Sequence, residues 1–194
     1  SGGSEIEIIP ENLFRNCINA ENFNRTFLEC KKIKSIPENL FKYNTKAKKF
    51  ENTFAVCEGL EEIPKELFKY NTETLAFDST FRGCKKLKEI SEELFKYNIN
   101  MTEFSSTFSD CVGLMSIPEG LFKNNINVTS FESTFSRSTI INIPGGLFEN
   151  NINVTNFSST FLQCTGLMSI PETIIEYGKK VKEKGGDTHA MFRW

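Results

Sequence analysis

A short sequence unit returns along this chain at a nearly constant interval, and this periodicity limits the folds that the chain can adopt. The dipeptide Thr-Phe occurs six times, at spacings of 27, 27, 27, 27 and 26 residues. The phenylalanines of these pairs are Phe27, Phe54, Phe81, Phe108, Phe135 and Phe161. Self-similarity at such a period is the signature of repeat architectures, in which each unit buries its apolar face against its neighbours.

The full unit is F-x-x-T-F-x-x-C-x-x-L-x-x-I-P-x-x-L-F-x-x-N, followed by a short connection. Of the 19 phenylalanines, 18 occupy three fixed columns of this unit, and only Phe192 lies outside them. A residue type confined to fixed columns is expected to stack on its counterparts in the neighbouring repeats, where each ring can bury roughly 150–250 Å². We therefore assign the phenylalanine columns to the core and give them no binding role.

The segments between these columns predict short secondary-structure elements. L-x-x-I predicts a strand of two to four residues in a parallel stack, which ends where proline cannot donate a hydrogen bond. P-x-x-L-F-x-x-N predicts a helix of one to two turns, with asparagine as a left-handed stop. F-x-x-T-F-x-x-C predicts a second short helix, for which Thr102, Thr129 and Thr155 are suitable N-caps. The predicted fold class is an α/β repeat solenoid of leucine-rich-repeat type, with about six repeats of 26–27 residues.

The ends of the chain depart from the repeat. Residues 1–5 are interpreted as a linker or expression remnant, 6–177 as the solenoid and 178–194 as a C-terminal cap and tail. Lys179 to Lys184 form a charged stretch suited to a polar cap. Because the first repeat begins in mid-unit at Ile6, we expect any self-association, or a junction with a missing domain, at the N-terminal end of the solenoid.

At this point the repeat resembles a known family. Phe104 to Pro118 resembles BspA-type leucine-rich repeats. Asn127-Val128-Thr129 and Asn153-Val154-Thr155 resemble the related mycoplasma-type surface repeat, although phenylalanine and threonine replace its two methionines. The resemblance covers residues 6 to about 177. It implies a leucine-rich-repeat fold and an origin among bacterial surface proteins, adhesins and phage-encoded proteins, and it supplies no catalytic residues.

Composition and motifs argue against several classes of function. A formal net charge of -2 is no electrostatic footprint for nucleic acid. No apolar run approaches the ~18 residues that a membrane span needs. The single histidine, His189, lies in a glycine-rich tail that we expect to be mobile, so no catalytic role is assigned to it. We predict that the chain is not an enzyme and has no catalytic residues and no cofactor.

The cysteines also predict a structural role. No C-x-x-C pair of the kind that holds zinc is present, so no metal site is expected. Cys57, Cys84 and Cys111 fall in a core column and are predicted to be reduced, buried and inert. Cys17 stands apart and is expected to be exposed. In the fifth repeat one residue is missing, so either Arg137 or Ser138 takes the place of the cysteine.

A candidate partner-binding surface emerges where the sequence varies while the core repeats. The pair of residues between the leucine and isoleucine columns carries charge in the first three repeats and is neutral in the last three. The predicted site residues are Met115, Ser116, Arg137, Ile141, Asn142, Met168 and Ser169. Apolar anchors surrounded by neutral polar groups, with arginine enriched, are typical of interface hot spots. The alternative is that one or more of these side chains turn inward.

These features predict a non-enzymatic module that binds a protein or surface glycan. The leading hypothesis is a bacterial surface or phage-associated adhesin or receptor-binding domain, on a cell surface or virion rather than in the cytoplasm. The alternative is an intracellular inhibitor or scaffold, encoded by a phage or bacterium, that docks on a host protein complex; free cysteines favour this alternative. A third possibility is an assembly module that stacks through an open solenoid end.

Overall fold

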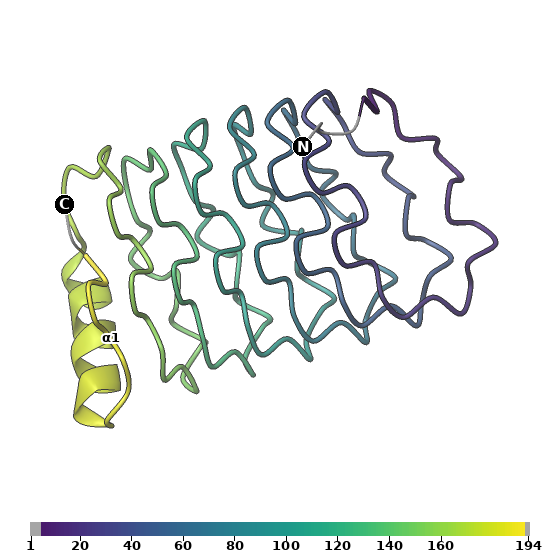
Figure 1. Ribbon diagram of the computed structural model, residues 1–194. Coiled ribbons are helices and arrows are strands. Elements are labelled where there is room, and N and C mark those ends of the chain that lie inside the picture. The colour runs from purple at the N-terminus through teal and green to yellow at the C-terminus, as the bar shows by residue number, and fades with distance from the viewer. Residues whose placement is uncertain (1–4, 193–194) are drawn as a thin grey trace.

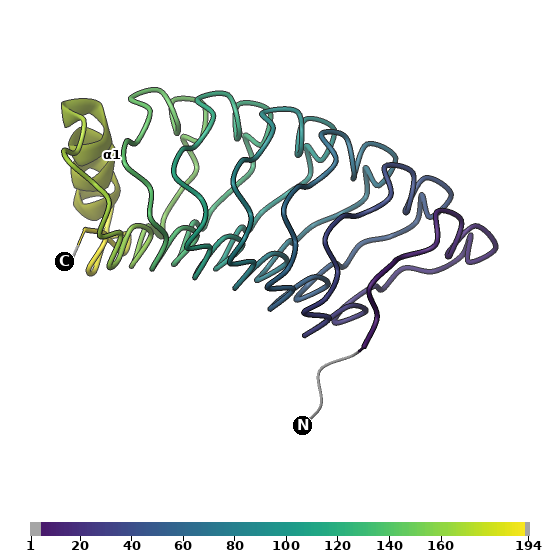
Figure 2. The same cartoon turned by 90° about the horizontal axis from the view of Figure 1, so that it is seen from above.

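The computed structural model describes residues 5–192, which wind into successive coils stacked along one axis (Figure 1). A single helix, α1 (Glu172–Glu183), lies at the C-terminal end of the described coils. The coils are spaced more closely along one edge than along the other, so the stack is curved (Figure 2). The chain is therefore a solenoid, as the 27-residue period predicts.

Neighbouring coils are joined by a parallel series of single β-bridges, one residue before the first phenylalanine column. The successive rungs are Asn22, Lys49, Ala76, Glu103, Ser130, Asn156 and Asp187. The L-x-x-I segments, where the strand stack was predicted, carry one bridge, between Ser116 and Asn142. The predicted location of the parallel stack is thus wrong for most coils. Inward residues three positions apart do not follow the two-residue alternation of a strand, which explains the difference.

The F-x-x-T-F-x-x-C segment is a run of tight turns, and the helix predicted there is wrong. The amide of Arg25 donates to the carbonyl of Glu51 in the next coil at 2.9 Å, whereas the amide of Thr26 donates to Phe23 at 3.3 Å. Because every second amide bonds to the neighbouring coil, the α-helical i→i−4 pattern cannot form. The residue two positions after each phenylalanine has a positive φ. These non-glycine residues are Arg25, Glu29, Asn52, Val56, Ser79, Ser106, Asp110, Ser133, Arg137, Ser159 and Gln163.

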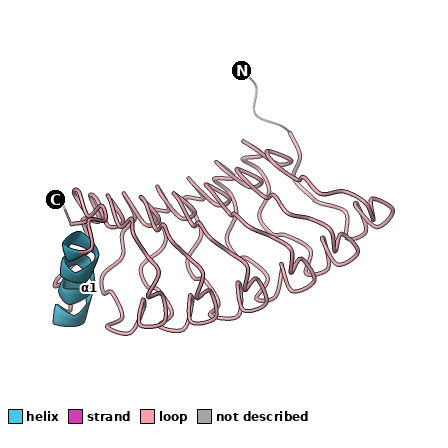
Figure 3. Cartoon of the chain, turned by 90° about the horizontal axis from the view of Figure 1, so that it is seen from below, coloured by secondary structure: helices cyan, strands magenta, loops and turns pink. Residues whose placement is uncertain are grey.

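The P-x-x-L-F-x-x-N segment is also made of turns, apart from α1, its C-terminal counterpart (Figure 3). The predicted asparagine stop is wrong, because these asparagines are buried and none has a positive φ. Asn71 Nδ2 donates to the carbonyls of Phe41 at 3.1 Å and Asn44 at 2.8 Å in the preceding coil. The same two bonds recur in every coil from Asn44 to Asn151. Asparagine is needed here as a donor between coils, since buried carbonyls require partners.

The predicted threonine N-caps are wrong for the same reason. The amide of Thr129 donates to the carbonyl of Thr102 at 2.9 Å, and its hydroxyl donates to the same oxygen at 3.2 Å. No helix starts at Thr102, Thr129 or Thr155. These residues therefore join one coil to the next instead of starting a helix.

The core is built from stacked phenylalanine columns, as the repeat predicts. Phe54 stacks on Phe27 at 5.3 Å between ring centroids and on Phe81 at 5.6 Å, with nearly parallel planes. Rings of the other two columns meet between these stacks at steeper angles, for example Phe41 and Phe50 at 4.8 Å. Offset and edge-to-face contacts of this kind add to the area that the rings bury.

Residues 187–192 form a further coil position, so the expectation of a mobile tail is wrong for this part of the chain. The amide of Ser159 donates to the carbonyl of His189 at 2.8 Å. Phe192 stacks on Phe161 at 5.7 Å and thereby joins a column from which the sequence pattern excluded it. The reason is that α1 lengthens the last coil, so these residues fall out of the 27-residue register yet resume the same hydrogen bonding.

Candidate binding surface

The predicted apolar row lies on the outside of neighbouring coils. Met115 is 54% exposed and Met168 is 83% exposed, whereas Ile141 is half-buried. The amide of Ile141 donates to the carbonyl of Met115 at 3.0 Å, and the amide of Met168 donates to Ile141 at 3.3 Å. These bonds place the three residues side by side on consecutive coils. The alternative of inward-facing side chains does not apply to either methionine.

The polar members of the site accompany this row. Ser116, Asn142 and Ser169 are exposed, and Ser116 and Asn142 form the one bridge of this segment. None of the three carries a charge, so the row is an apolar strip bordered by hydroxyl and amide groups. Such a strip can bury a partner's apolar surface with little desolvation of charge.

Arg137 belongs to a different segment of its coil. It is exposed at a positive-φ position of the tight turns, where its Nε donates to Gln163 Oε1 at 3.1 Å. Its guanidinium is also 3.9 Å from Asp110 Oδ1. The residue that fills the cysteine column is Ser138, whose buried hydroxyl donates to the carbonyl of Phe135 at 2.6 Å. Of the two alternatives that the sequence left open, Arg137 is therefore excluded from the column.

The missing residue of the fifth repeat has a local compensation. The hydroxyl of Thr139 donates to the carbonyl of Val112 in the preceding coil at 2.7 Å. In one earlier coil a backbone amide reaches across at this place, since Gly59 donates to the carbonyl of Lys31 at 3.0 Å. A side-chain donor thus replaces a backbone donor, so the irregularity preserves coil-to-coil bonding beside the apolar row.

In the first repeats the same row is charged. The column that holds Met115, Ile141 and Met168 in the later coils holds Lys34, Glu61 and Lys88 in the first three. These charged residues line a shallow polar hollow of about 460 Å³. In the same coils Glu58 lies 3.6 Å from Lys31 and 3.2 Å from Lys85, so one carboxylate is shared between lysines of the coils before and after it. Both lysines favour the charged form of Glu58, whose pKa is lowered chiefly by the hydrogen bond from Lys85.

A second exposed apolar column was not predicted from the sequence. It follows the buried asparagines by one position and contains Ile99, Ile126 and Ile152, which are 53%, 52% and 75% exposed. The same position is Ile18 in the first repeat, threonine in the next two and isoleucine in the last three. This column adds to the apolar character of the C-terminal half.

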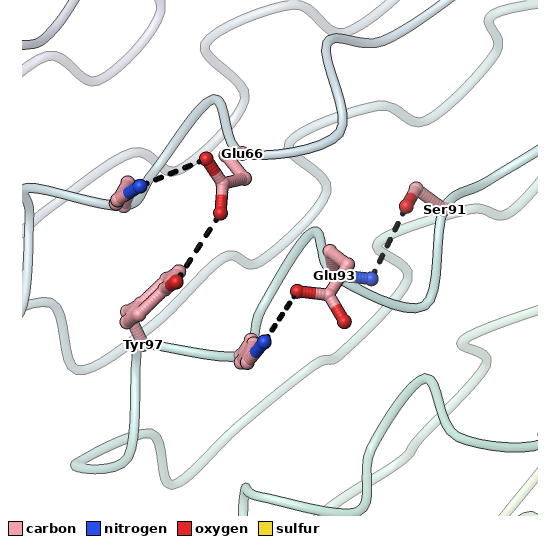
Figure 4. A network of polar contacts seen from close by, with 6 residues as sticks. Glu66, Ser91, Glu93 and Tyr97 are labelled. Carbon is pink, nitrogen blue, oxygen red and sulfur yellow. Dashed lines mark hydrogen bonds and ion pairs between the residues drawn. The ribbon is translucent and has the colours of Figure 1, made fainter.

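The N-terminal half instead carries a polar network on its P-x-x-L-F-x-x-N turns (Figure 4). Glu66 accepts from Lys69 at 3.0 Å and from the Tyr97 hydroxyl at 3.2 Å. Lys69 Nζ also lies between the rings of Tyr70 and Tyr97, 6.0 and 5.5 Å from their centroids. Similar lysine–tyrosine contacts occur in the preceding coil. These contacts link successive coils.

The cysteine column is part of the buried core. All six cysteines are free thiols, and only Cys17 is exposed. Burial raises the pKa of Cys57 to about 12 and that of Cys111 to about 12, and it raises the pKa of Cys84 as well. Cys84 Sγ donates to the carbonyl of Phe54 at 3.4 Å. These thiols therefore lack the thiolate character that nucleophilic cysteines need.

Two further observations bear on the class of protein. Among residues 5–192, no group of three or more histidine, cysteine, aspartate or glutamate side chains is arranged to hold a metal ion. No helix within the same residues is long and apolar enough to cross a membrane.

No protein-family model matches the chain, and no curated protein sequence matches it either. Among solved structures, it is similar to the Drosophila Toll–Spätzle complex, with 14% identity over 84% of this chain and 37% of that chain, at a TM-score of 0.37. The leucine-rich-repeat protein of T. pallidum matches with 16% identity over 82% of this chain and 71% of that chain, at a TM-score of 0.36.

A leucine-rich cell-surface protein of Faecalibacterium prausnitzii matches with 19% identity over 76% of this chain and 35% of that chain, at a TM-score of 0.32. The chain spans little more than a third of the length of the Toll and Faecalibacterium structures that it matches. The chain itself is a solenoid of stacked coils with an exposed apolar row on its C-terminal half.

Proposed function

We propose that the chain is a non-enzymatic binding module that holds a macromolecular partner on the outer face of its C-terminal coils. The row of Met115, Ile141 and Met168 carries this proposal, because two of its members are strongly exposed and all three lie on consecutive coils. Methionine is common at adaptable binding surfaces, where its flexible side chain fits varied partners. The partner is a protein or a surface glycan.

The setting that we propose is a bacterial surface or a virion, where the chain acts as an adhesin or receptor-binding domain. The resemblance of Phe104 to Pro118 to BspA-type repeats supports this setting. The alternative is an intracellular inhibitor or scaffold that docks on a host protein complex. One observation favours the alternative: all six cysteines are free thiols, whereas disulfides persist in oxidising compartments.

A matched pair of double variants tests the proposed surface. Ser116→Glu with Asn142→Glu places two carboxylates beside the apolar row, and we expect it to weaken binding of the labelled protein to whole target cells at least tenfold. Lys34→Glu with Lys88→Glu changes the equivalent positions of the N-terminal coils and should leave binding within twofold. All four positions are exposed, so the melting temperature should change little in either variant.

The reverse pattern, with binding lost only in the lysine variant, would transfer the site to the charged coils. Binding assays on two kinds of target distinguish the adhesin from the intracellular inhibitor or scaffold. Binding to intact cells supports the adhesin, whereas saturable binding only to a purified intracellular complex supports the inhibitor or scaffold.

A further inference from the structure

Within the tight turns, the hydrogen bonds between coils all run in one direction. In the tight turns, alternate amides donate to carbonyls of the following coil, as Phe157 does to Asp187 at 2.7 Å and Phe161 does to Met191 at 3.0 Å. The first coil therefore presents acceptors at one end of the solenoid, and the last coil presents donors at the other. This polarity makes the two ends chemically complementary.

The two rows of unused groups are in matching register. Within residues 5–192, the amides of Thr188, Ala190 and Phe192 find no acceptor. Their counterparts one coil earlier are the amides of Phe157, Ser159 and Phe161, all of which are bonded. At the opposite end, the described residues supply no amide to the carbonyls of Asn22, Asn24 and Thr26. Three donors thus face outward from one end and three acceptors from the other, at the same alternate spacing.

Apolar groups are exposed at both ends. Leu13 is 44% exposed, although its column is buried in the next coil, where Leu40 is 2% exposed. At the C-terminal end, α1 and the last turns leave a largely apolar cavity of about 290 Å³. Its lining includes Ile175, Met191 and Phe192. Ile175, which is 39% exposed, stands in the phenylalanine column that begins with Phe14. Each end therefore presents part of an interior column.

Charge favours contact between unlike ends. The N-terminal coil carries Glu5, Glu7, Glu11 and Glu21 against two cations, Arg15 and Arg25, and Lys32 of the same part of the chain pairs with Glu5 and Glu7. Lys179 and Lys182 line the C-terminal cavity. Although Glu21 already lies 3.1 Å from Lys48, Glu58 shows that a carboxylate in this solenoid accommodates lysines from the coils on both sides.

We propose that the molecule self-associates head to tail, with the C-terminal end of one copy seated on the N-terminal end of the next. The amides of the last coil donate to the carbonyls of Asn22, Asn24 and Thr26 of the second copy, so the ladder continues across the joint. Ile175 and Phe192 then meet the first coil's phenylalanine columns. A contact between two different faces leaves one face of each end copy free, so the assembly grows beyond a dimer, into a filament or, where the rotation between copies closes, into a ring.

Two end-blocked variants test this arrangement. Leu13→Glu with Ile18→Glu blocks the N-terminal end, and Ile175→Glu with Lys182→Glu blocks the C-terminal end; all four side chains are exposed, so folding should persist. In concentration-dependent light scattering, we expect the unmodified chain to exceed twice the monomer mass and each variant alone to remain monomeric. An equimolar mixture of the two should reach twice the monomer mass and no more, since one joint remains usable.

Met115→Glu, on the side of the solenoid, is the control and should associate like the unmodified chain. A strict monomer at every concentration up to about 1 mM would overturn the proposal. Dimers formed by either blocked variant alone would also overturn it, because they require like ends to meet. The test is independent of the partner-binding row, so its failure leaves the proposed function untouched.

Discussion

The two halves of the solenoid share one interior and differ on the surface. Residues 1–97 contain 16 lysines and arginines with 16 acidic residues, whereas residues 98–194 contain 7 and 9. The phenylalanine, threonine and asparagine columns nevertheless run through both halves with the same contacts. Coil stacking therefore leaves the outward positions free to differ, and the proposed binding row lies in the half that carries fewer charges.

The largest expected effect tests the shared interior. Asn71→Ala and Asn125→Ala each remove a buried amide that donates to two carbonyls of the preceding coil, at 3.1 and 2.8 Å for Asn71 and at 3.1 and 2.9 Å for Asn125. We expect each to destabilise the fold by about 2–4 kcal/mol in thermal unfolding. The losses of stability caused by Asn71→Ala and Asn125→Ala should agree within about 1 kcal/mol. A larger difference would show that the asparagine column does not stabilise the two halves equally.

A smaller expected effect is the pH dependence of stability that Asp78, in the charged N-terminal half, produces. Asp78 is partly buried near Glu103 and Glu51, and burial followed by these two carboxylates raises its pKa from 3.8 to about 6. The folded state therefore favours the protonated form. The corresponding stability is fully present below pH 3.8 and is lost as the pH rises through 6.

Asp78→Asn should accordingly be more stable than the unmodified chain at pH 7.5, by about 1–2 kcal/mol after allowance for partial exposure, and equal to it near pH 3.5. Thermal melts across this pH range measure the difference. Glu89→Gln, at an exposed position, is the control. A constant difference at all pH values would show that the titration of Asp78 is not responsible.

The next effect concerns the backbone of the tight turns. Gly83 has a φ of 72°, and an added Cβ would lie 3.5 Å from its nearest neighbour, so there is space for the atom. Gly83→Ala should still destabilise the fold by about 1 kcal/mol, because a left-handed conformation is unfavourable for residues with a Cβ. Gly145→Ala in the other half has no positive φ and should change the unfolding temperature by less. If the two substitutions lowered the unfolding temperature equally, the left-handed backbone of Gly83 would not be the cause.

The smallest effect concerns the ion pairs of the N-terminal half. Glu58→Gln removes the carboxylate that Lys31 and Lys85 share, and we expect a loss of less than about 0.5 kcal/mol because the groups are partly solvated. The loss should disappear in 1 M salt, where charges are screened within a few ångströms. A loss that persists in high salt would mean that Glu58 acts through packing.

The interior could be predicted from the sequence because its columns repeat. The phenylalanine stacks and the buried cysteines follow from residue type and spacing alone. The helices could not be predicted correctly, since P-x-x-L-F and F-x-x-T-F have helical spacing when one coil is considered in isolation. Alternate amides of F-x-x-T-F bond to the neighbouring coil instead, and this competition is visible only when coils are stacked. The amides of P-x-x-L-F form i→i−3 turns within the coil, while the asparagine that follows bonds to the preceding coil.

The candidate site was predicted in part. Met115 and Met168 are exposed as the row requires, whereas Ile141 is half-buried and Arg137 belongs to the tight turns. The column of Ile99, Ile126 and Ile152 was missed because its position is threonine in two earlier coils. An outward column need not keep its residue type along the chain, so the repeat pattern does not reveal it.

The asparagine column has a consequence for how such a molecule can change length. Each asparagine from Asn44 to Asn151 bonds to its predecessor through the same two carbonyls, so every joint offers the next coil an identical template. A coil duplicated or deleted as a whole leaves all remaining donors and acceptors matched. The span of the outer face can therefore be set in steps of one coil, while stability grows by a nearly constant increment per step.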